Sequence, residues 1–323
     1  MRKPIRLQNI ISQRAILVNG LTQVLQEFPL GEPWFMLLLT VSVVLTHGNG
    51  TTPVTDGLLA ATKNILIKTD RDGVIVNSSG RGLYRIAQFL SRVAPALDTF
   101  AAVSGTYRAH IPIYFANPLL LRPEDSVLDT SRYNTVEFYL TFGSLSDLLG
   151  TVGTDTATFN FDLAVVKGEQ STKVNPAGKP RVKPYIAAYP PVDPAGQQYI
   201  EFEKARDLAI AQIAALAANA VTAGVPFSGT PADTIIDTWQ VHDNIGFPIL
   251  GMKHFNAQYL AKIEQQIETF PAGWFYYNFV KDGSIFSAYP TGDKSMLRLE
   301  WVNGTLSTSG VTSIIFGIRA LSS

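Results

Sequence analysis

Alternation of apolar and polar residues with a period of two dominates the 323-residue chain. In residues 136–142, apolar side chains occupy every second position, which places them on one face of a strand. The same alternation recurs at 159–165, 297–301 and 314–318. These segments predict antiparallel strands of β-sandwiches, each with one buried face.

The strongest apolar run covers residues 34–45. Its first part, 34–38, is apolar on both faces, so we expect it to be covered twice, by the opposing sheet and by another domain or subunit. The run is too short to span a membrane, which takes about 20 residues. Its second part alternates, and the residues expected on the shared face are Leu39, Val41, Val43 and Leu45.

Two segments have helical spacing instead. Apolar residues recur at helical intervals in 83–93, before Pro95, and again in 260–270, before Pro271, with Asn256 as the expected N-cap. The expected buried side of the second helix consists of Leu260, Ile263, Ile267 and Phe270.

Residues 208–225 form a third distinctive segment, because they are mostly alanine. This composition, with Gln212 and Asn219 inside it, predicts a buried or packing helix rather than one that faces lipid. We therefore expect no transmembrane span in the chain.

The order of elements repeats along the chain. Each predicted helix is followed by a strand, then by an alternating strand, and finally by a closing strand, which predicts two tandem copies of one β fold. The polar stretch 167–184, rich in Pro, Gly and Lys, indicates a linker between an N-terminal domain at 1–166 and a C-terminal domain at 185–323. The predicted fold is mainly all-β: two tandem eight-stranded jelly-roll β-sandwiches with a few short helices.

Charge and composition exclude several classes of protein. The 26 basic residues equal the 26 acidic ones, and each half of the chain, divided after residue 165, carries 13 of each. A balanced charge argues against a protein that neutralises nucleic acid phosphates, so no specific nucleic-acid site is expected. Since cysteine is absent, disulfides, thiolate metal sites and cysteine nucleophiles are excluded.

One stretch carries a resemblance to a known family. Residues 117–149 contain an Asn-Pro turn, an Arg-Pro and acidic stretch, a Leu-Asp-Thr step, an alternating strand and a Gly-Ser turn with a nearby Asp. This order resembles the N-terminal domain of double jelly-roll major capsid proteins of tailless, internal-membrane bacteriophages, of corticovirus and finnlakevirus type in the PRD1-adenovirus lineage. The motif residues are Asn117, Pro118, Arg122, Pro123, Glu124, Asp125, Asp129, Gly143 and Asp147.

The resemblance implies a structural role in a virion. It implies a homotrimer that tiles an icosahedral capsid, meets vertex or penton and minor capsid proteins, and is made in the host cytoplasm. It also implies an N-terminal arm near an internal membrane, where the basic residues Arg2, Lys3 and Arg6 suit anionic lipid headgroups. The stretch also includes Arg14, and a solvated start to the chain explains these basic residues without contact to lipid or nucleic acid.

The motif also has a purely structural interpretation. Its prolines prevent ladder pairing and order a surface connection. Arg122 can pair with Glu124, Asp125 or Asp129, while Asp129 or Asp147 can cap a backbone turn. A salt-bridged loop is favoured over a cation site, because the carboxylates lack the fixed spacing of a calcium loop.

Signals of catalysis are weak. The sequence contains no phosphate-binding loop, nucleophile elbow or zinc-protease motif, so we expect neither an enzyme nor a cofactor. His242, Asp243 and His254 could supply metal ligands, but their spacing matches no compact site and a metal is not expected.

Three functions remain open at this level. The leading one is a capsid protein, and the alternative is a carbohydrate-binding β-sandwich, a spike or lectin-like module, that uses the aromatic residues of 274–279 as a stacking platform. A β-sandwich hydrolase ranks last, because no pair of nucleophile and base stands out.

Overall fold

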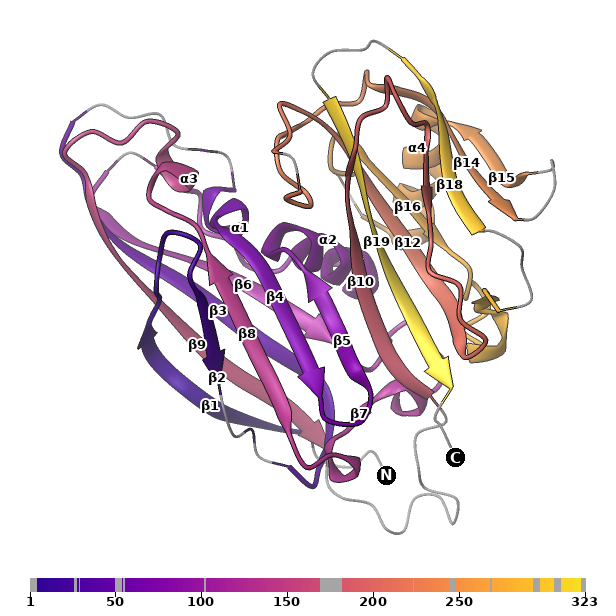
Figure 1. The fold of residues 1–323 in the computed structure, drawn as a ribbon, viewed down its shortest axis with the longest axis horizontal. Coiled ribbons are helices and arrows are strands. Elements are labelled where there is room, and N and C mark those ends of the chain that lie inside the picture. Colours follow the sequence, from indigo (N-terminus) through magenta and orange to yellow (C-terminus); the bar gives the residue numbers. More distant parts are fainter. Residues whose placement is uncertain are drawn as a thin grey trace. The chain divides into compact units, whose positions relative to one another are not determined.

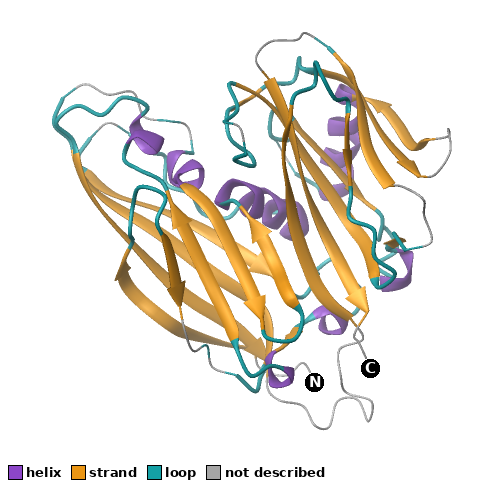
Figure 2. Cartoon of the chain, viewed as in Figure 1, coloured by secondary structure: helices purple, strands orange, loops and turns teal. Residues whose placement is uncertain are grey.

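The computed structural model describes most of the chain, and it divides into two compact units. The first unit ends at Pro184 and the second begins at Tyr185, but Phe89–Val93 and Leu119–Arg122 also belong to the second unit. Strands dominate both units (Figure 2). The described residues are 5–25, 28, 30–49, 54, 56–101, 103–168, 182–222, 224–243, 248–267, 269–292, 297–304 and 309–320.

The strands of the first unit lie in two sheets (Figure 1). The strand order is β1-β9-β3-β6 in one sheet and β2-β8-β4-β5 in the other. The short strand β7 (Leu128–Asp129) pairs with the start of β3. The main strands are β1 (Ile5–Ala15), β2 (Thr22–Leu25), β3 (Pro33–Thr46), β4 (Thr62–Thr69), β5 (Gly73–Ser78), β6 (Gly105–Tyr114), β8 (Val136–Phe142) and β9 (Thr156–Gly168).

The second unit repeats this plan. Its sheets have the orders β10-β19-β12-β16 and β11-β18-β14-β15. The short strands β13 (Thr230–Pro231) and β17 (Tyr289–Pro290) pair with β12. The main strands are β10 (Val182–Val192), β11 (Tyr199–Glu201), β12 (Leu208–Asn219), β14 (Ile236–Asp243), β15 (Pro248–Lys253), β16 (Trp274–Asn278), β18 (Leu297–Asn303) and β19 (Ser309–Ala320).

The two units share one topology. When the short strands β7, β13 and β17 are left out, each unit has eight strands, which we count in chain order. In both units the first strand pairs with the eighth, the eighth with the third, and the third with the sixth. The second, seventh, fourth and fifth strands form the other sheet in both units. The helices α2 (Gly80–Ser91) and α4 (His254–Gln265) each follow the fifth strand of their unit. The predicted repeat of a helix and three strands is therefore confirmed, and each unit has the strand order of an eight-stranded jelly roll.

Strand β3 shows why the first unit folds this way. The predicted shared face is confirmed, because Leu39, Val41, Val43 and Leu45 are all buried. The aromatic rings of Phe142 on β8 and Phe159 on β9 pack at 5.2 Å between centroids. Burial of each such apolar side chain stabilises the sandwich by about 1.5–3 kcal/mol.

The core of the second unit is centred on Trp239. Its ring stacks on Phe275 at 5.1 Å and meets Trp301 edge-on at 6.2 Å. The indole N–H of Trp239 donates to Nδ1 of His254 over 2.7 Å. Because Nδ1 accepts this bond, the ring proton of His254 is on Nε2. The Nε2–H group donates a hydrogen bond to Oδ1 of Asp233 over 3.0 Å.

The prediction of a helix in the alanine-rich segment is wrong. Residues 208–219 form strand β12, which lies between β19 and β16. Ten of the side chains from Leu208 to Ala218 are buried, so the strand is covered on both faces. Alanine favours helices when local propensity decides, but here burial between sheet neighbours decides instead.

The predictions for α2 and α4 are each confirmed only in part, since α2 ends at Ser91 and leaves Val93 outside the helix and 68% exposed. Leu83, Ile86 and Phe89 are buried, as expected. Helix α4 begins at His254 and ends at Gln265, before the left-handed residue Gln266, so neither Asn256 nor Pro271 bounds it. Its buried residues are His254, Ala257, Ala261 and Gln265, whereas Ile263 is 56% exposed and Leu260 is only half-buried.

The predicted linker lies mostly outside the described residues. Strand β9 continues to Gly168 and β10 starts at Val182, so both ends of 167–184 lie in strands. The domain boundaries at 166 and 185 stay predictions. Among the described residues, no helix is long and apolar enough to cross a membrane.

Candidate functional site: a braced loop and an apolar helix surface

The motif residues from Asn117 to Asp125 form a braced surface loop. Asn117 is fully buried, and its backbone N–H donates to Oγ of Ser126 over 2.8 Å. The same hydroxyl donates to the carbonyl of Pro123 at 3.1 Å, which closes the single 3-10 turn Pro123–Ser126. The two motif acids of this turn, Glu124 and Asp125, lie in its first residues.

Two motif carboxylates cap turns, which confirms that interpretation. Asp129 accepts from the backbone N–H of Ser131 at 3.2 Å, at the start of the 3-10 turn Thr130–Arg132. Asp147 accepts from the N–H of Ser144 at 2.8 Å, at the start of α3 (Ser146–Leu149). Both acids therefore satisfy backbone donors that the turns leave open.

Gly143 is required by close packing at this second turn. A Cβ there would lie 2.1 Å from Oδ2 of Asp147 and 2.7 Å from Cε of Lys63. Lys63 and Asp147 form an ion pair, so the carboxylate cannot move away without losing two partners. The glycine therefore leaves room for the ion pair between Lys63 and Asp147.

The N-terminal residues are only partly described. Arg2 and Lys3 lie outside the described residues. Arg6 is exposed on β1, opposite Lys167 of β9, so at this position the chain is already part of a sheet. The membrane-facing role of Arg2, Lys3 and Arg6 stays a prediction.

A half-buried ion pair between Asp72, in the β4–β5 turn, and Lys183 gives a pH-dependent prediction. Asp72 accepts from Lys183 at 2.6 Å and from the hydroxyl of Tyr133 at 2.5 Å. Burial disfavours the charged carboxylate, but these two bonds outweigh it and lower the pKa of Asp72. Such a group contributes stability above its unfolded pKa, near 4, and this contribution is lost as the pH falls through the folded value.

Replacing Asp72 by asparagine should therefore destabilise the protein in a pH-dependent manner. We expect a loss of about 1.5–3 kcal/mol at pH 7, because the charged partner of Lys183 is removed. The difference should shrink as the pH falls from about 4 to 2, where the wild-type acid is itself protonated. Thermal unfolding of both proteins across this range measures it, and a difference that does not depend on pH would contradict it.

The histidines take part in local hydrogen bonds. His47 binds the carboxylate of Asp155 at 2.6 Å, and His110 binds Thr40 at 3.0 Å. Nε2 of His242 lies 3.1 Å from Oε1 of Gln240 and 3.5 Å from Oε2 of Glu300. In the described part of the chain, no three His, Cys, Asp or Glu residues gather in a way that could hold a metal ion.

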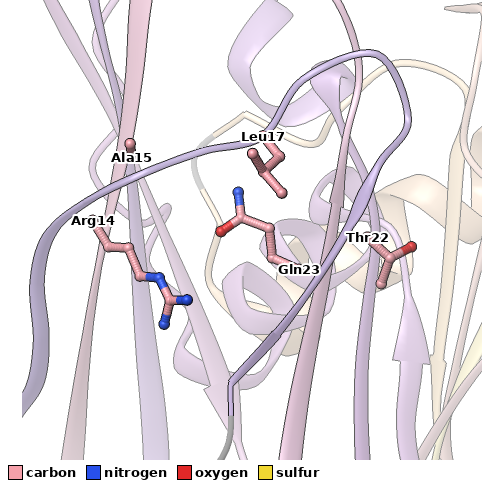
Figure 3. Close-up of a pocket in the computed structure, with 5 residues that line it drawn as sticks. All are labelled: Arg14, Ala15, Leu17, Thr22 and Gln23. Carbon is pink, nitrogen blue, oxygen red and sulfur yellow. The ribbon is translucent and has the colours of Figure 1, made fainter.

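An open hollow of about 420 Å³ lies beside β1 and β2 (Figure 3). Within the described residues its polar side chains are Arg14, Thr22 and Gln23, with Ala15 and Leu17 as the apolar ones. The Thr22 hydroxyl is already hydrogen-bonded to Thr141 at 2.9 Å. This lining provides a cation, an amide and a bonded hydroxyl, but no pair of nucleophile and base.

The aromatic strand β16 does not form an exposed stacking platform. Trp274, Phe275 and Tyr276 are 0–3% exposed. Phe275 belongs to the core between the sheets, while Trp274 stacks on Phe227 at 5.3 Å on the opposite face of the strand. These aromatic residues therefore stabilise the fold from both sides of the sheet.

Helix α4 presents an apolar surface that sequence reasoning missed. Phe255, Tyr259 and Ile263, which we call the α4 stripe, are 74%, 61% and 56% exposed. Spacing of four residues places them on one side of the helix, one above the other. The alanines at 257 and 261 were the available signal, because small residues at this spacing let the other side of the helix pack closely.

Comparison with known proteins identifies the architecture. No family model and no curated protein matches the chain. Solved structures match over almost all of it. The STIV MCP, from Sulfolobus Turreted Icosahedral Virus, superposes with a TM-score of 0.73 and 11% identity, over 98% of this chain and 97% of that chain. The fold is a double jelly roll.

Two further double jelly rolls support this assignment. The major capsid protein P2 from Bacteriophage PM2 has a TM-score of 0.63 and 12% identity, over 99% of this chain and 98% of that chain. The PBCV-1 virus capsid has a TM-score of 0.60 and 12% identity, over 100% of this chain and 96% of that chain. The predicted fold class is thus confirmed, and at these identities the likeness concerns the fold.

Proposed function

We propose that this chain is a major capsid protein that assembles as pseudo-hexagonal trimers. The observation that carries the proposal is the repeated strand order of the two units, together with the likeness to capsid proteins over almost the whole chain. A trimer of such chains contains six jelly rolls of one topology, and six similar domains in a ring can occupy a six-coordinated position of a closed shell.

The remaining parts of the proposal follow from this role. The chain acts as a structural protein of the virion rather than as an enzyme, and its main partner is a further copy of itself. Vertex and minor capsid proteins are further partners, and an internal membrane faces Arg2, Lys3 and Arg6. A neutral net charge supports dense packing of many copies, because it limits their mutual repulsion.

The carbohydrate-binding alternative loses its main support. It needed exposed aromatic residues on strand β16, and three of these are buried. Tyr277 and Phe279 are half-buried and pack against each other edge-on at 5.0 Å. The capsid role is therefore favoured.

Size-exclusion chromatography with light scattering tests the proposal. We expect a stable species near three times 35.2 kDa, the mass of one chain. Icosahedral particles in electron micrographs of the source material would support the shell, and phospholipid in those particles would support the membrane. A protein that stays monomeric at all concentrations, or one that binds glycans as a monomer, would overturn the proposal.

A further inference from the structure

The hollow beside β1 and β2 contains a buried polar side chain that lacks a hydrogen-bond partner. Gln23 is only 5% exposed, and it lies on β2 opposite Leu140, a core residue of the first unit. In the part of the chain that the structure describes, the amide nitrogen Nε2 of Gln23 finds no acceptor. Burying an amide in this way is unfavourable, because its hydrogen bonds to water are lost and not replaced. Gln23 therefore indicates a ligand that supplies the missing partner.

Arg14 supplies a positive charge to the same hollow. It is exposed at the end of β1, and among the described residues it has no ion pair. Asp162, next to the β9 partner of Arg14, instead accepts from the backbone and side chain of Gln13 at 2.8 and 3.3 Å. Figure 3 shows Arg14 and Gln23 pointing into the space between β1 and β2. Since no described residue of the lining is an acid, this charge favours a carboxylate from outside.

The two strands that border the hollow are both at the edge of a sheet. Strand β1 is at one end of the order β1-β9-β3-β6, and β2 is at the end of the other sheet. Residues 16–21 cross between them, with the N–H of Ile16 bonded to Phe159 and that of Gly20 bonded to Phe142. The free edge of a strand presents backbone donors and acceptors to any extended segment that lies beside it. The position of the hollow thus favours a peptide as the ligand.

Strand β1 is also poorly covered for a strand of a sandwich. Residues 6–9 and 12–15 are all exposed, so both faces of the strand are open there, whereas a sandwich strand normally buries one face. Leu7 is 65% exposed. In the connection to β2, Leu17 and Leu21 are 52% and 57% exposed. A segment in the hollow would therefore meet apolar side chains beside the charge of Arg14.

We propose that the hollow between β1 and β2 binds an extended peptide segment that carries an acidic side chain. The guanidinium of Arg14 pairs with the carboxylate of that side chain, and Leu17 contacts an apolar residue of the segment. The side-chain amide of Gln23 pairs with a peptide group, which offers both a donor and an acceptor. A half-turn of the terminal torsion exchanges the nitrogen and oxygen of Gln23, so either one can face the segment.

The size of the hollow agrees with this ligand. Its volume of about 420 Å³ is within the range of ligand pockets, about 300–1,000 Å³. Because the hollow is open, a longer chain can place one part in it and continue on either side. Such a peptide partner goes beyond the proposed function, whose main partner is a further copy of the chain.

Peptide binding to the full-length protein tests the proposal. The probes are capped peptides of about nine residues, with glutamate at the centre and alternating apolar and polar residues around it. A second set has glutamine at the centre and is otherwise identical. An array selects the best pair, and fluorescence anisotropy measures both dissociation constants. We expect the glutamate peptide to bind about tenfold more tightly, because hydrogen bonds to a charged group are stronger than those between neutral groups.

Three variants assign the binding to the hollow. Arg14→Gln should remove the preference for glutamate, whereas Arg71→Gln, the same change at an exposed residue of the β4–β5 turn, should keep it. Gln23→Leu should weaken both peptides about tenfold. Its melting temperature should stay equal or rise, because an unpartnered buried amide is replaced by an apolar side chain. A purely structural role of Gln23 would instead lower the melting temperature and leave the affinity unchanged.

Several results would overturn the proposal. A wild-type protein that binds no glutamate peptide at millimolar concentration has no such site, and an equal preference in Arg14→Gln and Arg71→Gln places the recognition elsewhere. If N-acetylglutamate binds as tightly as the best peptide, the ligand is a small carboxylate. If Arg14→Gln alone loses a self-associated species, the occupant is a second copy of this chain. All of these results leave the capsid role standing, because light scattering of the wild-type chain tests that role separately.

Discussion

Replacing Trp239 by alanine should destabilise the second unit by about 3–5 kcal/mol. The side chain is fully buried between the two sheets, where it packs on Phe275 and Trp301. Its removal leaves a cavity that the sheet neighbours cannot fill without moving. It also removes the donor that binds Nδ1 of His254 at 2.7 Å.

Urea unfolding followed by circular dichroism measures this loss. Trp239→Phe serves as the matched variant, because it keeps an aromatic ring but removes the N–H donor. We expect that variant to cost less, about 1–3 kcal/mol, chiefly for the unsatisfied acceptor on His254. An alanine variant that is no less stable than the phenylalanine variant would show that the ring does not organise this core.

Replacing Asp56 by asparagine should cost about 3 kcal/mol, because it removes the charge partner of a buried arginine. Arg81 is only 4% exposed, and its guanidinium donates to Asp56 at 2.7 and 3.1 Å. Asparagine is the suitable replacement, since residue 56 has a φ of 52°, a left-handed conformation that asparagine tolerates. The pair joins the residue before α1 (Gly57–Ala61) to the first turn of α2.

An exposed ion pair provides the control for this prediction. Lys253 and Asp237 also form an ion pair, but their side chains are 62% and 42% exposed. Asp237→Asn should therefore change the stability by less than about 1 kcal/mol. If both asparagine variants lose the same amount in parallel thermal melts, burial does not determine the strength of the Asp56–Arg81 pair.

The sequence predicts the half-buried strands well because their pattern has a direct physical cause. In β8, alternate side chains point to the core and to solvent, and the burial of the strand alternates accordingly. Strand β12 lacks this signal. Both of its faces are covered, so nothing alternates, and its alanines favour a helix when they are considered without their sheet neighbours.

Of the candidate functional residues, the sequence predicts the turn-capping acids but not the α4 stripe. The capping roles of Asp129 and Asp147 follow from local chemistry, since a carboxylate near a turn finds the free N–H groups of that turn. The α4 stripe was not predictable in this way. An apolar helix side has the same spacing whether it packs inside its own domain or outside it, and the expected core residue Ile263 belongs to the stripe.

Strand β12 also has a consequence for synthesis of the chain on the ribosome. From Leu208 to Asn219 it has no charge and no proline, and this composition is typical of segments that aggregate when their edges are free. Its two main partners are made later, β16 from Trp274 and β19 from Ser309. A nascent chain must therefore shield β12 while about a hundred further residues are translated, and a chain cut short before β19 would expose one edge of that strand permanently.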